Sequence, residues 1–85
     1  MIFDIKEVYC VLEVLRILGK KETRYSQMFK QTKVSHTTLQ KVLRGLAGKG
    51  IIKKHDIGHM NVKYEITNKG RRFLACLNEL ESLLK

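Results

Sequence analysis

The stretch that most constrains the fold is residues 34–52, VSHTTLQKVLRGLAGKGII. Its apolar residues recur at three- and four-residue spacing, which is typical of one face of an α-helix. These residues are Leu39, Val42, Leu43 and Leu46. Ser35 is a preferred N-cap residue, and Gly48 and Gly50 are typical of a helix end. The sequence therefore predicts a helix over 35–47 that buries one face and leads directly into a strand.

The opposite face of this predicted helix is polar. Such side chains can donate or accept hydrogen bonds at base edges, or reach phosphates. A glutamine there can pair with adenine through two hydrogen bonds, and Arg or Lys can pair with guanine. We therefore interpret the helix as one that enters the major groove of DNA. Its predicted DNA-binding residues are Ser35, His36, Thr37, Thr38, Gln40, Lys41 and Arg44.

The charge distribution favours a polyanionic partner. The chain carries a net charge of +9, and the excess lies in its middle. Residues 20–72 hold fourteen Lys or Arg against three acidic residues, whereas residues 1–19 and 73–85 are each slightly acidic. This distribution is expected if the ends serve folding or assembly and the centre meets phosphate. A basic surface that is merely solvated is the alternative.

The N-terminal segment predicts a helix over 4–18 with more apolar surface than one small domain requires. At 100° per residue its apolar side chains cover well over half of the circumference, and only Glu7 interrupts them. A helix packed on one small domain needs an apolar stripe of about 100° or somewhat more. The surplus face therefore favours a second copy of the chain as its partner.

A short second helix is predicted over 24–31, with Thr23 as its N-cap. Only residues 32–34 separate it from the helix over 35–47. Two short helices this close together are typical of a helix-turn-helix. The pair alone does not identify the fold, because many small helical proteins contain one.

Two strand-like runs, 51–55 and 61–67, follow the second helix of this pair. The loop between them, DIGHM, contains the glycine that a hairpin turn uses. We therefore predict one domain over 1–85 of the α+β class, mostly α: a winged helix-turn-helix with a two-stranded hairpin wing over 51–67. The DNA-binding residues predicted in the wing are Lys53, Lys54, His55, His59 and Lys63.

A last helix is predicted over 68–84, capped by Thr67 or Asn68. Cations crowd its first turn, where the helix dipole disfavours them, and this placement suggests a bound phosphate. A solvated basic turn is the alternative. The residues predicted to contact the DNA backbone are Lys20, Lys21, Arg24, Lys69, Arg71 and Arg72.

The first and last helices are predicted to form a homodimer interface. The last helix carries apolar residues at the 4-3-4 spacing of a coiled-coil seam, on a face that covers about half of its circumference. The predicted interface residues are Phe3, Cys10, Val14, Ile17, Cys76, Leu80, Leu83 and Leu84. A disulfide between subunits through either cysteine is a hypothesis, and a buried thiol is the alternative.

Two segments, TLQKVLRGLAGKGIIKK and VKYEITNKGRRFL, resemble the archaeal winged-helix proteins. This group includes small chromosomal DNA-binding proteins and regulators encoded by archaeal viruses. The matching residues are Leu39, Leu43, Leu46, Lys49, Gly50, Ile51, Ile52, Tyr64, Thr67, Lys69 and Gly70. The resemblance covers roughly residues 23–84 and implies a homodimer joined through the terminal helices. It carries over no DNA target, because the matching residues are almost all structural.

Other functions are less well supported. The sequence has no Gly-rich phosphate loop, no His-Glu helix motif and no paired carboxylates, so we expect neither an enzyme nor a cofactor. His55 and His59 straddle a loop without a suitably spaced Cys or Asp, so we expect no metal site. The absence of a signal or span predicts a cytoplasmic location. A transcription regulator leads, ahead of an architectural DNA-binding protein and a protein-interaction module.

Overall fold

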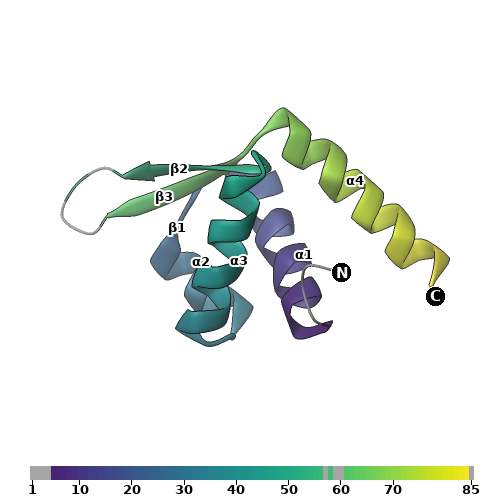
Figure 1. Ribbon diagram of the computed structural model, residues 1–85, viewed down its shortest axis with the longest axis horizontal. Coiled ribbons are helices and arrows are strands. Elements are labelled where there is room, and N and C mark those ends of the chain that lie inside the picture. The colour runs from purple at the N-terminus through teal and green to yellow at the C-terminus, as the bar shows by residue number, and fades with distance from the viewer. Residues whose placement is uncertain (1–4, 57, 59–60, 85) are drawn as a thin grey trace.

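The computed structural model describes residues 5–56, 58 and 61–84, which form four helices and a small sheet (Figure 1). The predicted α+β, mostly α fold is confirmed. The elements are α1 (Ile5–Lys20), β1 (Thr23–Arg24), α2 (Tyr25–Thr32), α3 (His36–Gly48), β2 (Ile52–Asp56), β3 (Val62–Ile66) and α4 (Asn68–Leu83). We use the word wing for β2, β3 and the loop between them. The predicted Asp4 start of the first helix, Phe3 and His59 lie outside the described residues.

The core lies between the helices and one face of the sheet, with α1 at its centre. α1 contacts α2, α3, α4 and β3. The spacing of apolar residues in α3 predicted its buried face correctly. These buried residues are Leu39, Val42, Leu43 and Leu46. They pack with Val14, Leu15 and Leu18 of α1 and with Met28 of α2. The exposed face of α3 is thereby held in a fixed orientation relative to the wing.

The sheet has three antiparallel strands in the order β1-β3-β2. The two-stranded sheet predicted from the sequence was therefore incomplete. β1 pairs Thr23 with Tyr64 and Arg24 with Lys63, so it joins the start of α2 to the wing. Because Thr23 lies in this strand, it does not cap α2. Arg24 occupies the N-cap position and forms no side-chain cap hydrogen bond, so the predicted Thr23 cap was wrong.

The connection between the wing and α4 depends on one threonine and one glycine. The Thr67 hydroxyl accepts a hydrogen bond from the Gly70 N–H at 3.0 Å, which confirms Thr67 as the N-cap of α4. It also lies 2.7 Å from the Gly50 carbonyl oxygen and 3.0 Å from that of Ile51. A Cβ at Gly70 would lie 2.1 Å from the Ile51 oxygen, so only glycine allows α4 to approach β2 this closely.

α4 then extends away from the body of the molecule toward the C-terminus (Figure 1). Phe73, Leu74 and Leu77, in its first half, pack against the core. Arg16 of α1 forms an ion pair with Glu81 at 2.6 Å. Among the described residues, no helix is long and apolar enough to cross a membrane.

Candidate nucleic-acid interface

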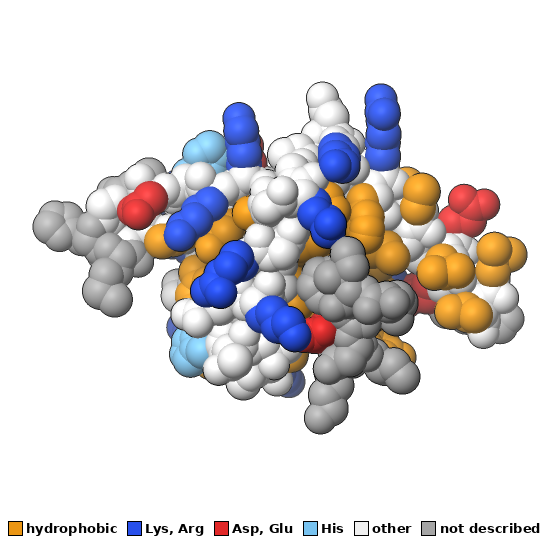
Figure 2. Space-filling view, in the orientation of Figure 1, with side chains coloured by type: hydrophobic (Ala, Val, Ile, Leu, Met, Phe, Trp, Pro, Cys, Tyr) orange, Lys and Arg blue, Asp and Glu red, His pale blue; other side chains and the backbone are white. Residues whose placement is uncertain are grey.

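The outward face of α3 is exposed along its length. His36, Thr37, Gln40, Lys41 and Arg44 are all exposed, as the sequence predicted. Figure 2 shows Lys and Arg side chains spread over α3 and the neighbouring wing on the side facing the viewer. The structure therefore leaves these five of the seven predicted DNA-binding residues of this helix exposed on its outward side.

Ser35 and Thr38, both predicted to bind DNA, form the N-terminal cap of α3. The Ser35 hydroxyl accepts a hydrogen bond from the Thr38 N–H at 3.2 Å and lies 3.0 Å from the Thr38 hydroxyl. Such a cap satisfies backbone donors that the first helical turn would otherwise leave unpaired. The predicted cap is confirmed, and both hydroxyls have a structural role at the start of α3.

His36 lies in a stack of three aromatic rings that joins α3 to α2. Its ring is 3.7 Å from that of Phe29 and 5.8 Å from that of Tyr25, and all three rings are nearly parallel. The Tyr25 hydroxyl lies 2.9 Å from His36 Nδ1. Burial raises the pKa of Tyr25, and the neighbouring Gln40 side chain partly offsets this increase. Two predicted base-reading residues therefore lie beside one hydroxyl of α2.

Lys41 forms an ion pair with a buried carboxylate of α1. Its Nζ lies 2.6 Å from Oε1 of Glu7, whose side chain is only 8% exposed. A buried carboxylate requires such a partner because removing a charge from water is costly. This pairing explains why one glutamate interrupts the apolar face of α1. It also means that the Lys41 charge is partly neutralised before any DNA binds.

A groove of about 560 Å³ lies between α3 and the wing. Its lining combines an apolar base with polar side chains, and consists of Tyr25, Gln40, Leu43, Arg44, Ala47, Lys54, Val62 and Tyr64. Arg44 and Lys54 are exposed, and neither forms an ion pair with any residue that the structure describes. Arg44 and Lys54, next to the outward face of α3, therefore have no counter-ion among the described residues.

The other predicted residues of the wing lie on the opposite side of the sheet. Side chains alternate between the two faces of a strand. Because Lys54 faces the groove, Lys53 and His55 point to the outer face, together with Lys63, the partner of His55 across the strands. The predicted DNA-binding residues of the wing therefore lie on both faces of the sheet.

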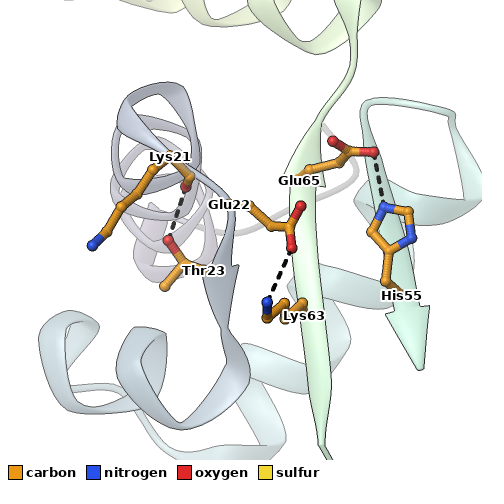
Figure 3. Close-up of polar contacts among 6 residues, drawn as sticks. All are labelled: Lys21, Glu22, Thr23, His55, Lys63 and Glu65. Carbon is orange, nitrogen blue, oxygen red and sulfur yellow. Dashed lines mark hydrogen bonds and ion pairs between the residues drawn. The ribbon is translucent and has the colours of Figure 1, made fainter. Parts of the chain in front are cut away.

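Acidic residues occupy this outer face of the sheet as well (Figure 3). Lys63 Nζ lies 3.5 Å from Glu22, and His55 Nε2 lies 2.8 Å from Glu65. Glu22, His55 and Glu65 place one possible metal ligand each within 4.8 Å of one another, although Lys63 already neutralises Glu22. The spacing of His55 and His59 gave no sign of these two glutamates, because only the folding of the chain brings them beside His55.

The basic first turn of α4 contacts the ends of other helices. Lys69 Nζ donates a hydrogen bond to the Lys49 carbonyl oxygen, at the C-terminus of α3, at 2.7 Å. Arg71 donates to the Gly19 carbonyl oxygen, in the last turn of α1, at 3.4 Å. Cations are favourable at helix C-termini. These contacts account for two of the cations without a phosphate, whereas the Arg72 side chain forms no hydrogen bond or ion pair with any described residue.

Lys20 and Lys21 are not brought to the groove between α3 and the wing. They line a different hollow, at the junction of α1 and α2, together with Glu13, Gln27 and Gln31. Arg24 lies in β1 and is exposed. The predicted backbone contacts are therefore spread over several surfaces of the molecule.

The predicted dimer residues fall into two groups. Cys10 and Val14 are only 1% and 0% exposed, so the expectation that they lie on a free apolar face was wrong. α1 is enclosed by three helices and β3, which cover its wide apolar surface within one chain. Ile17 is half-buried, whereas Cys76 is exposed. Leu80, Leu83 and Leu84 are exposed at the far end of α4, and Tyr9 of α1 is exposed too.

Three of these exposed residues, Tyr9, Leu80 and Leu84, line an apolar groove. The groove has a volume of about 240 Å³ and is lined by Val8, Tyr9, Leu12, Leu77, Leu80, Glu81 and Leu84. Both cysteines are free thiols, and burial is the main reason why the pKa of Cys10 rises to about 11. Cys10 is therefore unavailable for a bridge between subunits while the chain is folded.

Comparison with known protein families agrees with this architecture. A family model described as winged helix-turn-helix matches residues 6–85. The chain belongs to the winged helix-turn-helix family. A comparison with curated proteins found no match.

Several solved structures share the fold. A PadR family transcription regulator from Clostridium difficile is 21% identical, with a TM-score of 0.79; the match covers 89% of this chain and 90% of that protein. Protein smu.1704 from Streptococcus mutans is 19% identical, with a TM-score of 0.85, covering 99% and 86%. The transcriptional regulator BldR from Sulfolobus solfataricus is 24% identical, with a TM-score of 0.79, covering 89% and 57%. At these identities, the likeness shows the shared winged helix fold.

Proposed function

We propose that this winged helix-turn-helix protein is a transcription regulator that binds double-stranded DNA as a homodimer. In this proposal α3 enters the major groove, and the wing lies on the adjacent backbone or in the minor groove. The observation that carries it is the groove between α3 and the wing. There Arg44 and Lys54 lie beside an exposed polar helix face and form no ion pair with any described residue. The names of the similar solved proteins support the same function.

Within this arrangement the residues divide by role. The residues nearest the base edges lie in the first half of α3 and are His36, Thr37, Gln40 and Lys41. Of these, Gln40 pairs with adenine. Arg44 and Lys54 hold phosphates on either side of the groove, because phosphate contacts fix the position of a protein on the duplex. When DNA binds, Lys41 gives up part of its ion pair with Glu7 and contacts the DNA instead.

The second copy of the chain covers the apolar groove between α1 and α4. Leu80, Leu83 and Leu84 are 54%, 77% and 79% exposed, and Tyr9 is 67% exposed. Burying them against a symmetry mate removes this apolar surface from water. The α4 helices then set the distance between the two copies of α3. If a disulfide forms between subunits, Cys76 is the cysteine available for it.

The test is selection of bound duplexes from a random pool, followed by titration of the selected site at several salt concentrations. If each chain neutralises about five phosphates, the logarithm of affinity falls against the logarithm of salt concentration with a slope of about −4.5 per chain. Affinity that does not change between low and moderate salt would contradict the proposal.

The same selection separates a regulator from an architectural DNA-binding protein. A regulator binds its selected site at least about a thousandfold more tightly than random duplex, whereas an architectural protein binds both alike. Charge reversal at Arg44 should abolish binding in either case. Lys30→Glu is the control, because it changes the net charge by the same amount at an exposed residue of α2 that takes no part in the proposed interface.

A further inference from the structure

Tyr25 is the first residue of α2, outside the helix proposed to read DNA, yet it contacts two residues of that helix. His36 and Gln40 are one turn apart on α3 and therefore lie on the same side of it. The Tyr25 hydroxyl lies 2.9 Å from Nδ1 of His36, and the Gln40 side chain lines the same groove as Tyr25. One hydroxyl thus lies beside both side chains.

The hydrogen-bonding capacity of a phenol fits both contacts. A tyrosine hydroxyl can donate one hydrogen bond and accept others. If it donates to Nδ1 of a neutral His36, its oxygen remains free to accept an N–H from the Gln40 amide. This arrangement places the His36 hydrogen on Nε2. It also leaves the Gln40 carbonyl and its second amide hydrogen for a base, and adenine recognition requires both.

The aromatic stack restricts the same residues further. The His36 ring lies 3.7 Å from that of Phe29, with an angle of 10° between the planes, and Tyr25 is nearly parallel to Phe29. These contacts hold the imidazole ring against α2 and limit its rotation. Long side chains lose conformational entropy when they are fixed on binding, so holding them beforehand makes recognition more favourable.

From this geometry we infer that Tyr25 determines the DNA sequence preference of the protein by positioning His36 and Gln40, not by reading bases itself. The inference rests on the proposed function, because it requires α3 to read DNA. In this role Tyr25 is a positioning residue. Tyr25 affects the difference in binding affinity between the selected site and random duplex. It does not change the phosphate contacts, which the protein makes with both duplexes.

The test is Tyr25→Phe, which removes the hydroxyl and keeps the stacked ring. Losing one hydrogen bond predicts that affinity for the selected site falls by about fivefold, with affinity for random duplex, the salt slope and the melting temperature unchanged. A new selection should show weaker preference at the bases read by Gln40. Ser26→Ala is the control, because it removes an exposed hydroxyl from the next residue of α2, which takes no part in the proposed contacts.

A second measurement tests whether Tyr25 acts through these two residues. In a His36→Ala, Gln40→Ala background, adding Tyr25→Phe should cause no further loss of preference. In the free protein, nitrogen NMR should show His36 in one tautomer in the wild type and in a mixture in Tyr25→Phe. An additive loss, or an unchanged tautomer, would overturn the inference.

Failure of the inference can be told apart from failure of the proposed function. If the wild type selects a site and Tyr25→Phe selects it equally well, the inference fails and the function stands. If Tyr25→Phe weakens binding to selected and random duplex equally, Tyr25 is a general contact and the inference also fails. If the wild type shows no preference over random duplex, the proposed regulator and the inference are both overturned.

Discussion

At the scale of single residues, several charged side chains in this protein have structural partners that a count of basic residues does not reveal. Lys41 pairs with the buried Glu7, and Lys69 and Arg71 donate to carbonyl oxygens at helix ends. A net charge of +9 therefore overstates the number of cations available to a polyanion. Arg44 and Lys54 form no ion pair with any described residue, so they support DNA binding more directly than the total charge does.

Gly70→Ala should destabilise the fold. The new Cβ would lie 2.1 Å from the Ile51 carbonyl oxygen and 2.6 Å from the Ile66 side chain, so α4 or β2 would have to shift. We expect the free energy of unfolding in urea to fall by about 1–3 kcal/mol. Gly48→Ala is the control, because no atom lies within 4 Å of its added Cβ. Equal stability of the two variants would show that α4 is not held by this contact.

The two thiols should differ sharply in reactivity. Burial, followed by the charges of Glu13 and Glu7, raises the pKa of Cys10 from 9.0 to about 11, whereas Cys76 is exposed. Because the thiolate is the reactive form, a thiol reagent at pH 8 should modify Cys76 quickly and Cys10 only after unfolding. Mass spectrometry of the labelled peptides measures this difference. Rapid labelling of Cys10 in the folded protein would contradict its buried position.

The same shift predicts how stability depends on pH. Cys10 holds its proton more tightly in the folded state than in the unfolded state. Its contribution to stability is therefore fully present below about pH 9 and is lost as the pH rises through about 11. Urea unfolding at pH 8 and pH 10.5 should show the decrease, and Cys10→Ala should reduce this dependence on pH.

At the scale of elements, the wing has two different faces. Lys54 points toward α3, whereas Lys53, His55 and Lys63 lie on the outer face beside Glu22 and Glu65. Successive side chains of a strand point to opposite faces of the sheet, so residues that are neighbours in the sequence lie on different faces. Two adjacent lysines of β2 therefore offer a direct comparison between the faces.

Lys54→Gln should weaken DNA binding, and Lys53→Gln should not. If Lys54 neutralises one phosphate, its loss reduces the salt slope by about 0.9. The two variants have the same change in net charge, so a general charge effect would alter both equally. Titration against the selected duplex at several salt concentrations measures the slopes. Equal slopes for the two variants would argue against the groove as the DNA-binding surface.

At the scale of the whole molecule, the basic surface of α3 and the wing is separated from the exposed leucines of α4. The basic surface covers α3 and the wing, whereas the exposed leucines lie at the end of α4, which projects from the body (Figures 1 and 2). This separation suits a protein that binds DNA through one region and a second copy of itself through another. The buried positions of Cys10 and Val14 restrict that second region to α4 and the outer edge of α1.

Leu83→Asp combined with Leu84→Asp should convert a dimer to a monomer. Both side chains are more than three-quarters exposed in one chain, so the double variant should keep the melting behaviour of the fold while losing the association. Sedimentation equilibrium should give twice the chain mass of 9.9 kDa for the wild type and the chain mass for the variant. Ser82→Asp places a charge on the same helix as a control. A monomeric wild type would rule out the proposed assembly.

Features that depend on local chemistry could be predicted from the amino-acid sequence alone. The spacing of Leu39, Val42 and Leu46 predicted the buried face of α3, and Ser35 and Thr67 were identified as N-caps because their hydroxyls bond to nearby backbone. The order of helices and wing strands, and thus the winged helix fold, follows from such periodic and capping patterns.

Only the tertiary structure decided the features that depend on residues distant in the chain. β1 is two residues long, too short for any pattern, and it forms because β3 offers it hydrogen bonds. The pairing of Glu7 with Lys41 and the contact of Tyr25 with His36 depend on how α1 and α2 pack against α3. The α1 face that suggested a dimer is covered within one chain because three helices and β3 surround it, which a helical wheel cannot show.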